Sequence, residues 1–137
     1  MEVVRRILEV WRDEGPPKGD RFRRDLLSSG LLDAEIEWVN PPDAVEPGVR
    51  RGIEAFARAA QAVTDTFDGV RLEVDEIILD AGEQVVLLAT MHVRGRGSSA
   101  EVAIQLGHVW TIREGKAVRF EWFNDADQAL EAAGLSE

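Results

Sequence analysis

The residues best suited to chemistry lie near the end of the chain, at His108 and Asp125. An imidazole titrates near neutral pH, so His108 is the first candidate for a general acid or base. Asp125 is the second candidate, because a carboxylate close to the histidine could assist the same proton transfer. A histidine that is only hydrogen-bonded within the core would explain the sequence equally well. We therefore expect His108 and Asp125 to be catalytic residues, with a structural histidine as the alternative.

Asp125 also has a simpler interpretation. Gln128 follows it by three residues, and this spacing is typical of a capping box at the start of a helix. Asp127 then lies in the first helical turn, where a carboxylate interacts favourably with the helix dipole. Capping is thus the alternative role for Asp125, and we do not expect Asp127 to act as a base.

Which side chains share a face of the sheet with His108 depends on the register of the last two expected strands, 101–113 and 116–123. We expect Glu114 and Gly115 to belong to a three-residue loop, which makes residues of equal parity share one face. The buried face would then hold Val102, Ile104, Leu106, His108, Trp110, Ile112, Val118, Phe120, Trp122 and Asn124. A two-residue loop would instead bring Arg119 and Glu121 beside Trp110 and His108, which would place charges in the core.

An apolar face that carries a few polar groups is typical of a small-molecule site. Aromatic and amide side chains from several segments are expected on this face together with His108. The predicted ligand-binding residues are Trp38, Asn40, Phe56, Trp110, Trp122 and Asn124. The alternative is that the aromatic residues simply fill the core, where such side chains are commonly buried.

Helices are expected to dominate the first half of the chain. Residues 2–14 carry Val4, Ile7, Leu8 and Trp11 at helical spacing. A second helix is expected from Asp20, which can cap it, to Ser28. A third is expected to place one apolar stripe on a neighbouring sheet, formed by Ile53, Phe56, Ala57, Ala60, Val63 and Phe67.

Strands are expected to dominate the second half. Between the second and third helices, residues 34–40 alternate in polarity, so Ile36, Trp38 and Asn40 should share a face opposite Glu35 and Glu37. Prolines make 41–48 a loop. Four further strands should follow as hairpins at 70–80, 84–94, 101–113 and 116–123. The element order predicts an α+β fold in which residues 1–137 form a single domain and helices cover one face of an antiparallel sheet.

Composition excludes several classes of function. A net charge of −10 disfavours nucleic acid as a partner. The chain has no cysteine and only two histidines, His92 and His108. We expect His92 to lie at the surface, and we therefore expect no metal site. The sequence contains no glycine-rich loop of the kind that binds phosphate groups, so we expect no nucleotide or other cofactor. No run of roughly 20 apolar residues would cross a bilayer, so we expect no membrane partner and a cytoplasmic protein.

Four stretches together resemble a known family: 37–43, 46–56, 108–116 and Asp125 with 129–135. They are similar to the SnoaL-like branch of the NTF2-like superfamily, which includes polyketide cyclases and ketosteroid isomerase-like proteins. The resemblance implies a cone in which N-terminal helices and a short C-terminal helix accompany a curved, mostly antiparallel sheet. It also implies a homodimer that forms through the outer face of the sheet.

The same resemblance narrows the reactions to be considered. The chain has no tyrosine, whereas ketosteroid isomerase uses one in its oxyanion hole and scytalone dehydratase has pocket tyrosines. Limonene-type epoxide hydrolases use an Asp-Arg-Asp set, which Arg119 and Glu121 approach only in the two-residue-loop register. The resemblance therefore implies a cofactor-independent acid/base step, such as an aldol-type cyclisation or isomerisation, on an aromatic or polyketide-like substrate.

In this hypothesis His108, assisted by Asp125, moves the proton, and Asn40 or Asn124 orients the substrate. The alternative belongs to another class of protein. It is a non-catalytic protein of the same fold, which either binds a small apolar ligand or serves as a dimeric scaffold.

Overall fold

The computed structural model describes residues 2–12, 28–42, 44, 46–66, 69–95, 97 and 100–134. Its elements in chain order are α1 (Glu2–Arg12), β1 (Leu32–Asn40), β2 (Gly48–Arg51), α3 (Ile53–Thr66), β3 (Gly69–Ala81), β4 (Gln84–Arg94), β5 (Glu101–Arg113), β6 (Lys116–Phe123) and α4 (Ala126–Ala132). The helix expected from Asp20 lies outside the described residues except for Ser28. The side chains of Trp11, Val63 and Phe67 also lie outside the described part.

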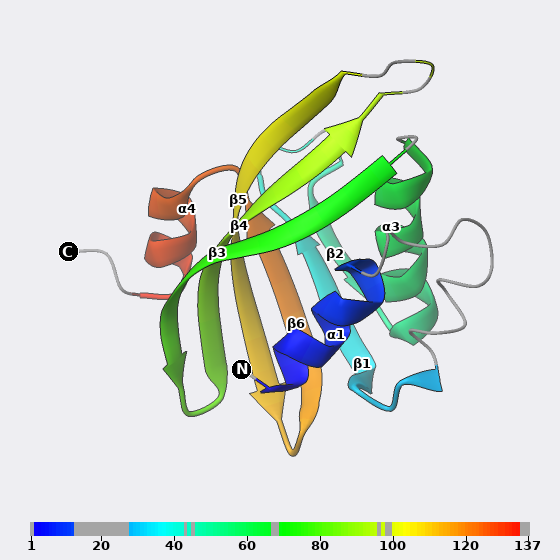
Figure 1. Cartoon of the computed structure of the whole chain (residues 1–137). Coiled ribbons are helices and arrows are strands. Elements are labelled where there is room, and N and C mark those ends of the chain that lie inside the picture. Colours follow the sequence, from blue (N-terminus) through cyan, green and yellow to red (C-terminus); the bar gives the residue numbers. More distant parts are fainter. Residues whose placement is uncertain are drawn as a thin grey trace.

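The strands form a single curved sheet in the order β2-β1-β6-β5-β4-β3 (Figure 1). Neighbouring strands are antiparallel except β1 and β6, which run parallel. This α+β architecture confirms the predicted fold class. Strand β2 was not predicted, because four residues after a proline-rich loop are too short to show an alternating pattern.

Helices α1 and α3 cover one face of the sheet, which we call the inner face and which carries Trp38 and His108. Two predicted helical stripes are buried there. Val4 and Ile7 of α1 are at most 1% exposed, and Phe56 of α3 is fully buried. These side chains join the core of the inner face, which also contains Leu8, Leu31, Leu32, Ile36, Trp38, Ala57, Ala60, Leu72, Val85, Leu87, Ala89, Trp110, Ala117 and Phe120. Hydrophobic burial on this face is therefore what joins the helices to the sheet.

The terminal hairpin differs from the expected one at its turn. Arg113 pairs with Lys116, so the loop has two residues, Glu114 and Gly115, both with positive φ as in a type I′ turn. Val118 then forms a bulge, because Ile112 pairs with Ala117 but Thr111 pairs with Arg119. The extra residue offsets the register by one, as a longer loop would have done.

The bulge restores the expected partners farther along the hairpin, where Trp110 pairs with Phe120 and His108 with Trp122. The loop length was wrong, but the predicted grouping of these four side chains is confirmed. Val118 is an exception, since the bulge turns it to the opposite face of the sheet beside Arg119.

Val102 is a second exception to the buried face. Its side chain is 56% exposed, although alternation placed it with His108. The outer end of the β4–β5 hairpin extends past the covering helices, so alternation there no longer implies burial (Figure 1). Periodicity defines a face, but a covering element is needed to bury it.

Helix α4 packs on the opposite face of the sheet, which we call the outer face. Val109, Phe123 and Ala129 form a small apolar cluster beneath it together with Val86. Gly107 permits this contact, because a Cβ atom there would lie 2.5 Å from the Cβ atom of Ala129. None of the described helices combines the length and apolar character needed to span a bilayer.

Candidate functional site

His108 lies on the inner face of β5 and is only 2% exposed. Its ring meets Phe120 edge-on at a centroid distance of 4.8 Å and Trp110 at 6.2 Å. Burial lowers the pKa of His108 from 6.5 to about 3, because a charged imidazole would lose its hydration. At neutral pH the imidazole is therefore uncharged.

Two ring nitrogens on the inner face have no hydrogen-bond partner among the described residues. They are Nδ1 of His108 and Nε1 of Trp110, and both are buried. Buried polar atoms in proteins are almost always paired, and an unpaired one costs about 1 to 3 kcal/mol. Two such atoms on neighbouring positions of one strand face mark this part of the core as chemically unusual.

Asn40 holds two of the other predicted ligand-binding residues in place. Its Oδ1 accepts hydrogen bonds from Nε1 of Trp38 at 2.8 Å and Nε1 of Trp122 at 2.6 Å. Its Nδ2 donates to the backbone carbonyl of Glu46 at 2.8 Å. Asn40 thus links β1, β6 and the loop that follows β1. The Trp38 contact could be inferred from alternation, whereas the Trp122 contact depends on the parallel β1–β6 pairing.

Aromatic packing connects this group to His108. The Trp38 ring lies 5.2 Å from Phe56 and 4.8 Å from Phe120, both with edge-on geometry. Phe120 also lies 4.5 Å from Trp110. The structure therefore brings five of the predicted residues together on the inner face: Trp38, Asn40, Phe56, His108 and Trp110. Trp122 completes this group through its bond to Asn40.

Asp125 is not brought to His108. Its Oδ1 accepts a hydrogen bond from the backbone N–H of Gln128 at 2.8 Å, which makes it the N-cap of α4. Its backbone carbonyl lies on the Gly107 side of β5, whereas His108 points to the inner face. The capping role is confirmed, although Gln128 Oε1 has no partner within the described residues and the reciprocal half of the box is not formed. Asn124 is exposed just before this cap.

His92 lies on the outer face, where Nδ1 contacts Oε1 of Glu101 at 3.2 Å. The same carboxylate contacts Arg71 at 3.7 Å. The side chain of His92 is 19% exposed, so it is more buried than the expected surface position. This cluster does not contact the inner face.

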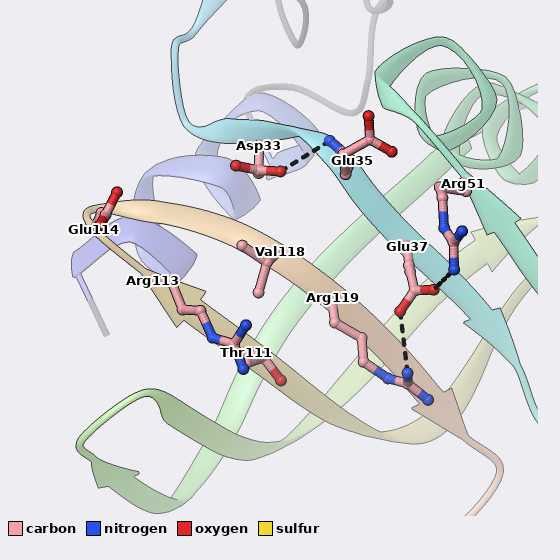
Figure 2. Close-up of a pocket in the computed structure, with 9 residues that line it drawn as sticks. All are labelled: Asp33, Glu35, Glu37, Arg51, Thr111, Arg113, Glu114, Val118 and Arg119. Carbon is pink, nitrogen blue, oxygen red and sulfur yellow. Dashed lines mark hydrogen bonds and ion pairs between the residues drawn. The ribbon is translucent and has the colours of Figure 1, made fainter.

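Sequence reasoning missed a groove of about 710 Å³ on the outer face. Its lining residues come from β1, β2 and the terminal hairpin: Asp33, Glu35, Glu37, Arg51, Thr111, Arg113, Glu114, Val118 and Arg119 (Figure 2). The signal was the row of acidic residues at alternate positions of β1. Its arginine partners could not be assigned without β2 and the bulge.

Glu37 lies at the centre of the charges in this groove, between two arginines (Figure 2). It accepts hydrogen bonds from Arg51 at 2.8 Å and Arg119 at 3.1 Å. The hydrogen bond from Arg51, supported by the charges of both arginines, lowers the pKa of Glu37. Arg119 also pairs with Glu121 at 3.1 Å. Because both guanidinium groups already have carboxylate partners, the groove is poorly suited to bind an anion.

Comparison with solved structures shows the same fold in several proteins. An NTF2-like protein of unknown function from Burkholderia pseudomallei K96243 is 24% identical, with 96% of this chain and 94% of that chain covered and a TM-score of 0.69. TerC, co-crystallized with polyporic acid, is 24% identical, with 95% of this chain and 94% of that chain covered and a TM-score of 0.70. A candidate SnoaL-like polyketide cyclase from Jannaschia sp. CCS1 is 17% identical, with 99% of this chain and 93% of that chain covered and a TM-score of 0.69.

No curated protein sequence matches the chain. The model of the SnoaL-like domain, in contrast, matches residues 4–120, which include α3 and strands β1 to β5 in full, most of α1 and the first part of β6. The chain therefore belongs to the SnoaL-like domain family.

Proposed function

We propose that the protein binds a small, mostly apolar molecule on the inner face of the sheet, next to His108 and Trp110. The observation that supports this most directly is the pair of buried nitrogens without partners among the described residues. A core selected for stability alone would be expected to pair or replace them, because each lowers stability. A ligand with its own hydrogen-bonding groups would satisfy them.

The burial pattern along β5 supports a particular entry side. Trp110 and His108 are at most 2% exposed, whereas Leu106 and Ile104 are half-buried and Val102 is exposed. The inner face therefore becomes accessible toward the start of β5. Trp122, the cross-strand partner of His108, is also half-buried. A ligand that enters from this side would meet apolar side chains before it reaches the two nitrogens.

A structural neighbour adds support at the level of the fold. TerC, which shares this fold, was co-crystallized with polyporic acid. Its identity to this chain is too low to transfer a ligand, so the proposal rests on the inner-face residues themselves.

Binding can be tested with Nile red, a neutral aromatic dye whose fluorescence rises in apolar surroundings. Leu106→Trp should weaken binding by about tenfold or more, because the larger ring would occupy the entry side. Gln105→Trp is the matched control, since Gln105 is exposed on the opposite face of the same strand. Equal effects of both substitutions, or no binding by the unmodified protein, would contradict the proposed site.

General acid/base catalysis is the second candidate function, and its support is the inner-face imidazole of His108 with Nδ1 unpaired among the described residues. The step would remove a proton from a carbon next to a carbonyl and return it elsewhere, as in an aldol-type cyclisation or isomerisation. His108 would act without Asp125, which caps α4. Exchange of the methyl protons of 1-acetonaphthone with deuterated water, followed by NMR, should be accelerated by the protein and not by His108→Gln. Equal rates would exclude this role.

We also propose that two copies of the chain associate through the outer face. In a two-fold symmetric dimer a patch contacts its own copy, so a surface with adjacent positive and negative charges is self-complementary. The groove formed by Glu37, Arg51 and Arg119 with their neighbours has this character.

A further inference from the structure

The indole nitrogens of the inner face differ in whether they have a hydrogen-bond acceptor. Those of Trp38 and Trp122 both donate to Asn40, whereas Nε1 of Trp110 is buried and has no acceptor among the described residues. An indole N–H is a donor only, so whatever satisfies it must offer an acceptor. We propose that Trp110 determines ligand specificity by donating a hydrogen bond to the carbonyl oxygen of an uncharged aromatic ligand. This inference rests on the proposed inner-face site and names the ligand class for it.

The requirement for an uncharged ligand follows from the surroundings of Trp110. Among the described residues the buried polar or charged side chains are Thr90 and His108. Thr90 pairs with Gln105 across β4 and β5 and donates to Asp75, away from the inner face. His108 is neutral at physiological pH, since burial lowers its pKa to about 3. A buried carboxylate would thus find no opposite charge in this part of the core, and burying it unpaired is strongly unfavourable.

The neighbouring rings favour a flat, aromatic ligand. Phe120 lies between the two polar residues, 4.8 Å from the His108 ring and 4.5 Å from the Trp110 ring. A planar ketone can pack against such rings while its oxygen, in the plane of the ligand, reaches an N–H group.

His108 is a less selective contact than Trp110. A nitrogen of neutral imidazole donates or accepts according to its tautomer, so Nδ1 of His108 tolerates either a hydroxyl or a second carbonyl. The indole N–H of Trp110 can only donate, so it requires an acceptor on the ligand.

Three probes of similar size test the need for an oxygen acceptor and the need for an uncharged ligand. They are the ketone 1-acetonaphthone, the hydrocarbon 1-ethylnaphthalene and the carboxylate 1-naphthoate. Isothermal titration calorimetry with the full chain should show the ketone binding about tenfold more tightly than the hydrocarbon, the gain of one good hydrogen bond. Trp110→Phe should remove this preference, so that the ketone and the hydrocarbon bind with similar affinities. Trp38→Phe is the matched control, because its nitrogen already has a partner, and it should change both affinities by the same factor.

A second measurement avoids any dependence on the folding of a variant. In the unmodified protein labelled with ¹⁵N, the indole N–H signal of Trp110 should move downfield with the ketone and not with the hydrocarbon. Equal binding of ketone and hydrocarbon, or an unmoved signal, would overturn the role of Trp110, and naphthoate binding as tightly as the ketone would overturn the requirement for an uncharged ligand. Each of these outcomes leaves the inner-face site in place. If none of the three probes binds, the proposed function fails together with this inference.

Discussion

His108 is neutral in the folded protein because burial lowers its pKa to about 3, compared with 6.5 in an exposed chain. Below pH 6.5 the unfolded chain binds a proton that the folded protein does not take up until about pH 3. The free energy of unfolding is therefore unaffected by His108 above pH 6.5. It falls by up to about 5 kcal/mol as the pH decreases from 6.5 to about 3, because protonation of His108 then favours the unfolded chain.

His108→Phe should remove this pH dependence and also the unpaired nitrogen. We expect the variant to be more stable than the unmodified protein by about 1 to 3 kcal/mol at pH 7.5, and by more at pH 4.5. Urea unfolding at several pH values measures both effects. Parallel stability curves for His108→Phe and the unmodified protein would contradict the burial argument.

Asn40 illustrates how one residue can orient several others. Its amide accepts from two indoles and donates to the carbonyl of Glu46. Asn40→Ala should lower the free energy of unfolding by about 2 kcal/mol, because two indole N–H groups lose their acceptor. Asn40→Asp keeps that acceptor but loses the donor to Glu46, so it should lose less. Chemical denaturation compares the two, and an equal loss in both variants would argue against the indole contacts.

At the scale of elements, the position of α4 depends on Gly107. A Cβ atom there would approach Ala129 Cβ at 2.5 Å and the carbonyl oxygen of Asp125 at 3.2 Å. Gly107→Ala should therefore destabilise the protein by about 1 to 3 kcal/mol through overpacking. Adding Ala129→Gly should recover part of the loss, after correction for the effect of Ala129→Gly alone. Strictly additive effects in the double mutant would show that the two side chains do not meet.

The start of α4 gives a test that separates capping from catalysis at Asp125. Asp125→Ala should cost about 1 kcal/mol of stability, because the N–H of Gln128 loses its acceptor. Asp125→Asn should preserve stability, since asparagine caps equally well without a charge. Neither variant should change Nile red binding. A loss of deuterium exchange in Asp125→Asn, with stability intact, would return Asp125 to a catalytic role.

At the scale of the whole molecule, the outer face is the surface proposed to join two copies. Light scattering during size-exclusion chromatography should give twice the mass of the chain. Val118→Arg should give a monomer, because it adds bulk and charge within the groove. Val102→Arg is the matched control, since Val102 is exposed but belongs to the other face of the sheet. A monomer for the unmodified protein at its highest attainable concentration would refute the dimer.

Prediction from the sequence succeeded where a pattern repeats over many residues. The stripe of Val4, Ile7 and Leu8 and the alternation around Ile36 and Trp38 were confirmed, because burial imposes the period of each element on its sequence. It failed at short or single-residue features. Strand β2, the type I′ turn at Glu114 and Gly115 and the bulge at Val118 leave no periodic signal.

The site shows the same division. Alternation along β5 predicts from the sequence that His108 and Trp110 share a face, because it depends only on the local chain. Trp38 joins that face through the pairing of β1 with β6. Tertiary packing places α4 on the other face, which separates Asp125 from His108. It also decides that Asn40 satisfies two indoles while the nitrogens of His108 and Trp110 have no partner among the described residues. Hydrogen-bond partners and covering elements come from distant segments, and the physical reason is that local patterns carry no information about which segments meet.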